Sequence, residues 1–243
     1  MRFVLDTHAH TLVSGHAYNT IKEMAFTAKE KDLEAIALTE HAPNLPWAPG
    51  LYYFDNLKVV PREMFGVKLL LGVELNILDE FGTVDLPESV YSELDIVIAS
   101  IHIPDDCYGI SRGISKNTQA YLKTIEKPGI NIIGHPDDIR FPVDYDMIVA
   151  AAKEHHVLLE LNNSSINPDG VRKGSRENQI KLIETCKKYK ADVSLGSDAH
   201  VDIDLANFKR TELLLETYDF PEELIVNTSL EKLLGYVNCG KNK

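Results

Sequence analysis

The sequence has few cysteines, no excess of basic residues and no long apolar run. Its three cysteines, Cys107, Cys186 and Cys239, are an odd number without close spacing, so neither a disulfide framework nor a thiolate zinc site is expected. A net charge of −12 argues against the broad basic face with which proteins grip long nucleic acids. The apolar runs are too short to span a bilayer, and no secretory signal precedes Asp6. We therefore expect a cytoplasmic protein that binds neither membranes nor long nucleic acids.

The remaining composition is typical of one α/β domain, expected to span residues 1–243, with 44% hydrophobic residues to fill a core. Short β-rich runs alternate with helical stretches, which predicts βα units around a parallel sheet. The seven runs are Phe3–Asp6, Ala35–Thr39, Val67–Val73, Asp95–Ser100, Asn131–Gly134, Val157–Leu161 and Asp192–Gly196. Apolar periodicity predicts helices over Thr20–Lys31, Asn117–Glu126, Tyr145–Glu154, Gln179–Tyr189 and Asp204–Thr217. Leu224–Val226 is a candidate for a very short eighth strand.

Potential metal ligands stand at the end of nearly every run. Asp6, His8 and His10 follow one another at spacings of two, so they leave the first strand in one direction. An acid and a histidine two residues apart recur at Asp198 and His200. The other candidates at run ends or in the first loop are His16, His41, Glu74, His102 and His135. In a parallel barrel these positions surround one mouth, so the sequence predicts that they converge.

Metal ions explain such a set better than surface hydrogen bonds do. A single histidine at a strand end is more often a hydrogen-bonded polar residue. Seven histidines gathered with Glu74 and Asp198 would lack partners and would repel one another once protonated. Nine ligands without cysteine exceed one tetrahedral site and predict two or three ions, for which Zn²⁺, Mn²⁺ or Fe²⁺ would be suitable. His155 and His156, at a predicted helix C-terminus, are expected on the surface.

The order of these motifs resembles the polymerase and histidinol phosphatase (PHP) superfamily over essentially the whole chain. The motifs are Asp-x-His-x-His at 6–10, Thr-Glu-His at 39–41, Gly-Val-Glu-Leu-Asn at 72–76, Ser-x-His at 100–102, Gly-His-Pro at 134–136 and Gly-Ser-Asp-Ala-His at 196–200. Ser14-Gly15-His16 and the segments that begin at Glu160 and Arg172 are more similar to the YcdX-type phosphatases. The resemblance implies a distorted, TIM-like seven-stranded (β/α)7 barrel with three metal ions, zinc above all.

The resemblance also implies how the ligands are shared. The implied sets are His8, His10, Glu74 and Asp198 for one ion, Glu74, His102 and His135 for a second, and His16, His41 and His200 for a third. Glu74 would then bridge two ions, and Asp198 is a candidate for a second bridge. Asp6 is expected to face the cluster or to orient His8.

A cluster of this kind supports hydrolysis of phosphate esters whatever its family. Two cations about 3.5–4 Å apart stabilise a bridging hydroxide near neutral pH and neutralise charge on the phosphoryl oxygens. Glu74 and Asp198 are therefore expected to be catalytic through the ions that they hold, and the acid that protonates the leaving group is not assigned. Arg172 and Lys173 are candidates for a phosphate clamp, with solvated surface charge as an equal alternative, and Arg112 is a weaker candidate. The expected substrate is a small anionic phosphomonoester.

Other functions are compatible with the same residues. A phosphodiesterase or nuclease acting on short oligonucleotides would use the same ions. A non-catalytic PHP module would use them for folding, although the intact ligand set around Glu74 argues against this alternative. An amidohydrolase would typically need a carbamylated lysine, which the strand ends do not offer. The sequence is also compatible with a homo-oligomer.

Aromatic residues follow the second run. Trp47, Tyr52, Tyr53 and Phe54 lie in or near the loop after His41. They are candidates for stacking on a ring of the substrate, but packing of the loop onto the barrel is the favoured explanation because aromatic side chains mostly serve as buried area.

Overall fold

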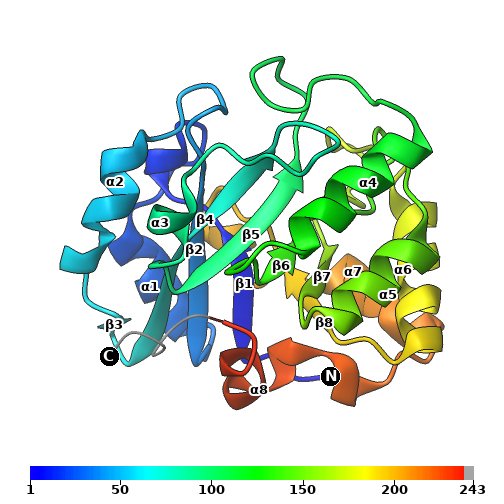
Figure 1. Ribbon diagram of the computed structural model, residues 1–243. Helices are drawn as coiled ribbons and strands as arrows, with labels where there is room; N and C mark the ends of the chain where they lie inside the picture. The colour runs from blue at the N-terminus through cyan, green and yellow to red at the C-terminus, as the bar shows by residue number, and fades with distance from the viewer. Residues whose placement is uncertain (238–243) are drawn as a thin grey trace.

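The computed structural model describes residues 1–237, which form a nearly closed barrel of parallel strands surrounded by helices (Figure 1). The parallel strands, in the order in which they are hydrogen-bonded, are β1 (Leu5–Ala9), β2 (Ala35–His41), β4 (Val67–Ile77), β5 (Ile96–Ile101), β6 (Ile132–Ile133), β7 (Leu158–Asn162) and β8 (Val193–Gly196). A short strand, β3 (Glu63–Met64), pairs antiparallel with the start of β4. The seven parallel strands confirm the predicted TIM-like (β/α)7 fold class.

Helices cover the outside of the barrel, with α1 to α3 against one side and α4 to α7 against the other (Figure 1). They are α1 (Ile21–Glu30), α2 (Leu51–Asn56), α3 (Glu88–Tyr91), α4 (Ile114–Ile125), α5 (Tyr145–Glu154), α6 (Arg176–Tyr189), α7 (Lys209–Thr217) and α8 (Leu230–Leu234). The start of α1 is fixed by a capping box in which Thr20 and Glu23 bond each other's backbone N–H groups. Within the described residues, no helix is long and apolar enough to cross a membrane.

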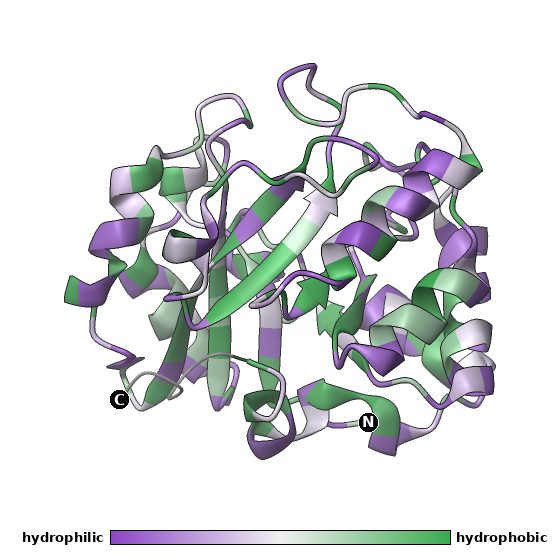
Figure 2. Ribbon diagram, in the orientation of Figure 1, coloured by the Kyte–Doolittle hydropathy of each residue, from purple (hydrophilic) through white to green (hydrophobic). Residues whose placement is uncertain are grey.

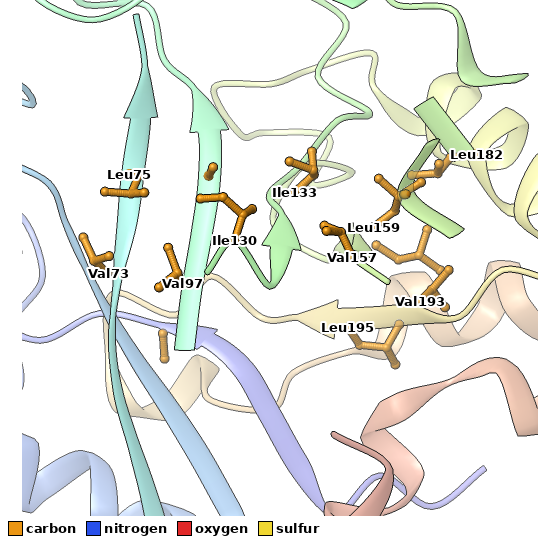
Figure 3. Packing of buried hydrophobic residues seen from close by; sticks show 14 of the residues in the cluster. Val73, Leu75, Val97, Ile130, Ile133, Val157, Leu159, Leu182, Val193 and Leu195 are labelled. Carbon is orange, nitrogen blue, oxygen red and sulfur yellow. The ribbon is translucent and has the colours of Figure 1, made fainter. Parts of the chain in front are cut away.

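Two apolar layers hold the barrel together. Alternate strand residues point outward and pack against the helices, and Figure 3 shows Leu159 of β7 close to Leu182 of α6. The strands are correspondingly hydrophobic, whereas the helices also carry hydrophilic residues (Figure 2). The inward-facing residues form a separate cluster at the amino-terminal end of the barrel, where Val226 and Leu233 of the last segment join it. This filling leaves the carboxyl end of the strands free for polar side chains.

The barrel seam lies between β1 and β8. A bridge joins Ala9 to Ala199, just beyond the end of β8. Further down, the side chain of Asn227 donates hydrogen bonds to the carbonyl oxygens of Leu5 and Leu195, at 3.1 and 2.8 Å. The Asn227 amide therefore satisfies buried carbonyl groups of β1 and β8 that would be paired with each other's strand if the two strands formed a continuous ladder. This closure brings the end of the first strand beside the end of the last.

The structure corrects several predicted boundaries. The helix predicted over Asp204–Thr217 begins only at Lys209, because Asp202–Asp204 is a 3-10 turn and Ala206 has a left-handed φ of 53°. The very short eighth strand predicted at Leu224–Val226 is reduced to a single parallel bridge between Ile225 and Val193, because two 3-10 turns flank Ile225. Cys107 and Cys186 are buried and unbonded, and Cys239 lies outside the described residues.

Candidate metal centre

Glu74 lies at the centre of the predicted ligands. Strand β4 continues to Ile77, so Glu74 is inside the strand rather than after it, and its carboxylate is almost fully buried. Its Oε1 atom is 2.9 Å from Nε2 of His135, and its Oε2 atom is 2.7 Å from Nδ1 of His41. The histidines with a nitrogen within 3.6 Å of this carboxylate are His8, His10, His41, His102 and His135. Residues in or just after four other strands, β1, β2, β5 and β6, thus meet around one acid.

Asp198, which follows β8, is the second acid of the cluster. Its Oδ1 atom is 3.4 Å from Nε2 of His10 and 3.6 Å from Nδ1 of His200, while its Oδ2 atom accepts a 2.8 Å bond from Arg172. Asp198 and His135 both have a left-handed backbone, with φ values of 55° and 30°. Such conformations are costly for residues with a side chain and concentrate at functional sites, where the surrounding structure enforces them.

Five of the seven histidines are oriented by an acceptor at Nδ1. The pairs, between 2.7 and 3.1 Å, are His8 with Glu160, His10 with the Ser14 hydroxyl, His16 with the Ser14 carbonyl, His102 with Asn76 and His200 with the Asp198 carbonyl. Carboxylate and carbonyl oxygens only accept, so Nδ1 donates to them. The Ser14 hydroxyl gives its own proton to Glu40 at 2.6 Å and therefore also accepts. Each neutral ring then presents the lone pair of Nε2, the arrangement typical of metal-binding histidines.

These lone pairs point at one another. The Nε2 atoms of His8 and His10 are 3.0 Å apart, and those of His16 and His200 are 2.9 Å apart. With their protons on Nδ1, the Nε2 atoms of His16 and His200 repel unless they share a cation, and those of His8 and His10 do so unless His8 carries a second proton. The Nε2 atom of His41 is buried without a hydrogen-bond partner in the described part of the chain, and its Nδ1 atom lies 2.7 Å from Oε2 of Glu74 without the alignment of a hydrogen bond. The donor set therefore fits divalent cations, which would supply the missing partners.

Three overlapping groups of residues offer ligand atoms that, within each group, all lie within 4.8 Å of one another. They are His10, His41 and His200; His8, His10 and Asp198; and His41, Glu74 and His102. These groups differ from the sets that the resemblance implies at two residues. His41 is grouped with Glu74 as well as with His200, and His10 is grouped with His200 as well as with His8 and Asp198. His16 joins the cluster through its contact with His200. The structure thus brings all nine predicted ligands together.

Burial and neighbouring charges shape the protonation of the cluster. Burial lowers the pKa of His10 and His135, and it lowers the pKa of His41 to about 4. Burial acts in the same direction on His8, but the charges of Glu160, Glu74 and Asp198 raise its pKa well above the usual value. Most rings are therefore held neutral, the form that binds metal.

The lowered pKa values predict that the histidines of the metal-free cluster contribute less to stability at pH 5 than at pH 7. The unfolded chain takes up a proton on His41 below pH 6.5, whereas the folded chain does so only near pH 4. Stability is lost as the pH falls between these values, by about 2 kcal/mol at pH 5 for His41 alone. The pKa values of three further histidines, His10, His16 and His135, are also lowered, so they too lower the stability as the pH falls. Among the shifted histidines of the cluster, only His8, whose pKa is raised, has the opposite effect. Asp137, whose pKa burial raises to about 7, acts in the opposite sense. Urea unfolding of the chelated protein at both pH values is therefore compared with that of a His41→Asn variant, and an equal pH dependence in the two proteins would contradict the contribution of His41.

Glu160 is a site residue to which the sequence analysis gave no role. Its carboxylate accepts from Nδ1 of His8 and from the backbone N–H of His135, both at 2.7 Å, and it is fully buried in β7. A side chain at Gly196 would meet it, because a Cβ there would lie 1.7 Å from Oε1. The signal was a charged residue inside an otherwise apolar run, which calls for a buried partner.

We expect Glu160→Gln to weaken metal binding and lower activity by about 10- to 100-fold, as is usual when the hydrogen-bond partner of a metal-binding histidine is changed. The amide keeps the shape of the carboxylate but cannot hold His8 with a negative charge. Metal titration and steady-state kinetics of the variant measure both effects. Unchanged affinity and turnover would show that the His8 ring is positioned without this charge.

The remaining predicted residues divide between the site and the surface. Arg172 is buried between Asp198, at 2.8 Å, and Asp138, at 3.6 Å. Lys173 is exposed, with no polar contact among the described residues, so its clamp role stays a prediction. Arg112 lies elsewhere, paired with Glu80.

Asp6 does not reach the imidazoles. Its carboxylate accepts from the backbone N–H groups of Ser197 and Ala206, at 3.1 and 2.8 Å, and from that of His8 at 3.2 Å. A register irregularity between Asp6 and Ala9 interrupts the side-chain alternation on which the expectation rested. Asp6 therefore supports the turn that leads to Asp198, and Glu160 orients the His8 ring.

A cavity of about 550 Å³ opens next to the cluster. Its floor includes His16, His41, His102, Asp198 and His200, and its wall comes from the loops after β2, β5 and β7. The aromatic residues of the β2 loop have different environments. Phe54 is buried, Tyr53 packs against the core, and Tyr52 is exposed, whereas Trp47 lines the cavity with 83% of its surface exposed.

A family model and several known proteins are similar to this chain. A model of the PHP domain matches residues 6–166. A protein of Clostridium novyi (strain NT), named "Probable phosphatase", is 44% identical over 244 residues, covering 100% of this chain and 98% of that protein. A protein of the same name from Caldicellulosiruptor saccharolyticus is 46% identical over 240 residues and 98% of each chain.

Among solved structures, the histidinol phosphate phosphatase of Lactococcus lactis, complexed with zinc, L-histidinol and phosphate, has a TM-score of 0.63. The alignment covers 89% of this chain and 94% of that one at 19% identity, so the likeness concerns the fold. The sequence relatives align over nearly their full length, and the family match spans more than half of the chain. On this evidence, the chain belongs to the PHP domain family.

Proposed function

We propose that this protein is a metal-dependent phosphatase that hydrolyses small phosphomonoesters, in a single domain over residues 1–243. The observation that carries the proposal is the convergence of Nε2 lone pairs on Glu74 and Asp198, with Nδ1 of His8 and His102 anchored on the opposite side of the ring. The relatives named "Probable phosphatase" and the zinc and phosphate in the neighbouring structure agree with it.

The three ligand groups support a site for two or three ions, of which zinc best suits the histidine-rich set and Mn²⁺ or Fe²⁺ are alternatives. Glu74 is the bridging ligand in this proposal, because both of its oxygens face imidazoles. When bound, the ions would supply an activated water and positive charge for the phosphoryl oxygens.

Arg172 contributes a fixed positive charge at the cavity. Burial would lower its pKa, but the carboxylates of Asp198 and Asp138 raise it above the ordinary value, so the guanidinium stays protonated. It lines the cavity beside Asp198, where it can donate to a phosphate oxygen and orient the substrate. We assign it the role of phosphate clamp.

The test compares phosphate release from phenyl phosphate with cleavage of the diester bis(4-nitrophenyl) phosphate. We expect the monoester to be hydrolysed faster, the activity to vanish on chelation, and Zn²⁺ or Mn²⁺ to restore it. Faster cleavage of the diester would favour the oligonucleotide alternative. Metal binding without turnover of either ester would favour a non-catalytic module.

A further inference from the structure

The outer wall of the cavity is apolar and exposed. Trp47, Ile103 and Val171 come from the loops after β2, β5 and β7, and 83%, 43% and 82% of their surfaces are exposed. Leu45, Pro46 and Pro104 complete this side of the cavity. Large apolar side chains exposed together around a cavity are typical of a ligand site, because a ligand removes them from water.

Trp47 is fixed relative to the cluster although its ring is exposed. Its backbone is left-handed, with a φ of 65°, which is rare for a bulky residue. The backbone of Trp47 packs on Gly15, where a Cβ would lie 2.6 Å from the Trp47 Cβ, so only glycine fits there. Gly15 directly precedes His16, which lines the same cavity. The backbone and Cβ of Trp47 are therefore held beside the candidate ligands before any ligand binds, so that only the side-chain torsions of the indole remain to be fixed, which lowers the entropic cost of binding.

The polar groups of the cavity narrow the class of ligand. Apart from the histidines, the charged lining residues are Arg140, Arg172 and Asp198, and Ser164 offers a hydroxyl. Asp198 is already bonded to Arg172, and Arg140 is paired with Asp138 at 2.6 Å. The described lining therefore has few free hydrogen-bonding groups for the hydroxyl groups of a sugar, and it has no unpaired carboxylate that could bind an ammonium group. This argues against sugar phosphates and against amines as ligands.

We propose that this wall is a ring subsite that selects phosphomonoesters whose organic part is a neutral planar ring. The proposal rests on the proposed function, since the phosphate would lie at the cluster while the ring lies between Trp47 and the apolar loops. The ring would cover the exposed indole by stacking, and Arg172 would face the phosphate.

Turnover tests the subsite with leaving groups of matched chemistry. Benzyl phosphate and glycerol 3-phosphate both release a primary alcohol, so a difference in kcat/KM between them reports how the enzyme recognises the organic part of the substrate. We expect benzyl phosphate to be preferred, and 4-(aminomethyl)benzyl phosphate to be poorer because of its ammonium group. Trp47→Ala should reduce the preference for benzyl phosphate about tenfold, the scale of a lost stacking partner. Trp47→Phe should retain most of it, and Tyr52→Ala, which changes an exposed aromatic outside the cavity, should retain all of it.

Binding tests it without turnover. Trp47 is the only tryptophan of the chain, so its fluorescence reports this wall alone. In the zinc-loaded protein, benzylphosphonate should shift the emission to shorter wavelength by covering the indole, and methylphosphonate should not. Equal responses to the two phosphonates, or no preference for benzyl phosphate, would overturn the ring subsite while leaving the phosphatase proposal intact. A selective shift without hydrolysis of any ester would support the subsite and overturn the phosphatase.

Discussion

Glu74→Gln is expected to lower kcat/KM for a phosphomonoester by at least about 10³-fold, since metal ions supply several kcal/mol of transition-state stabilisation. It should also release at least one equivalent of metal. Glu74 is the acid that five histidines surround, and both of its oxygens face imidazole nitrogens. The amide keeps the volume of the side chain and removes the charge, so the loss of activity would result from the missing metal ligand and not from a cavity left in the core. Kinetics and elemental analysis of the purified variant measure it.

The matched control is His156→Ala. His156 is also a histidine near a strand, but its Nε2 atom contacts the Gly235 carbonyl and its ring stacks on Tyr236, 3.9 Å away. It follows α5, at the opposite end of the barrel from the cluster, so turnover and metal content should not change. If Glu74→Gln kept its turnover, Glu74 would not be the bridging ligand.

Removal of the metal should abolish activity and lower the melting temperature. Ligands present at 100 to 1,000 times their dissociation constant stabilise a fold by about 3–4 kcal/mol, which in a chain of this size corresponds to about 5–15 °C for each ion released. The structural reason is that the ions bind the inward-facing ligand nitrogens, among them the Nε2 atoms of His16 and His200, which lie 2.9 Å apart and repel without a cation. Calorimetry before and after chelation, with Zn²⁺ or Mn²⁺ added back, measures the shift.

The same scans on Glu74→Gln serve as the internal control. A variant that already lacks an ion should respond less to the chelator than the unchanged protein does. An unchanged melting temperature after complete loss of metal would mean that the cluster is satisfied by protein groups alone.

The sequence was sufficient to predict the barrel and the gathering of the ligands, because both depend on local patterns. Strand runs alternate with helices, and side chains such as His41, the last residue of β2, and His102, just after β5, lie at the carboxyl ends of strands that form one mouth. The boundary of β4 was harder to predict, because Glu74 and Asn76 are polar and interrupt the apolar run, although both are buried within the strand.

What the sequence did not predict depends on contacts between distant segments. Glu160 pairs with His8 across 152 positions, and nothing near either residue specifies the pair. The proximity of His41 to Glu74 follows from the register between β2 and β4, in which the two residues are directly opposite. Trp47 reaches the cavity because Gly15 accommodates its backbone. Each is a property of the closed barrel and not of a local pattern.

The most direct test of the account is the number of metal ions in protein that is purified without added metal and shown to release phosphate. Elemental analysis and the phosphate assay are run on the same sample. The account predicts two or three equivalents of a transition metal, zinc foremost, with activity that falls in proportion as the metal is withdrawn. Phosphate release that persists without stoichiometric metal would contradict it.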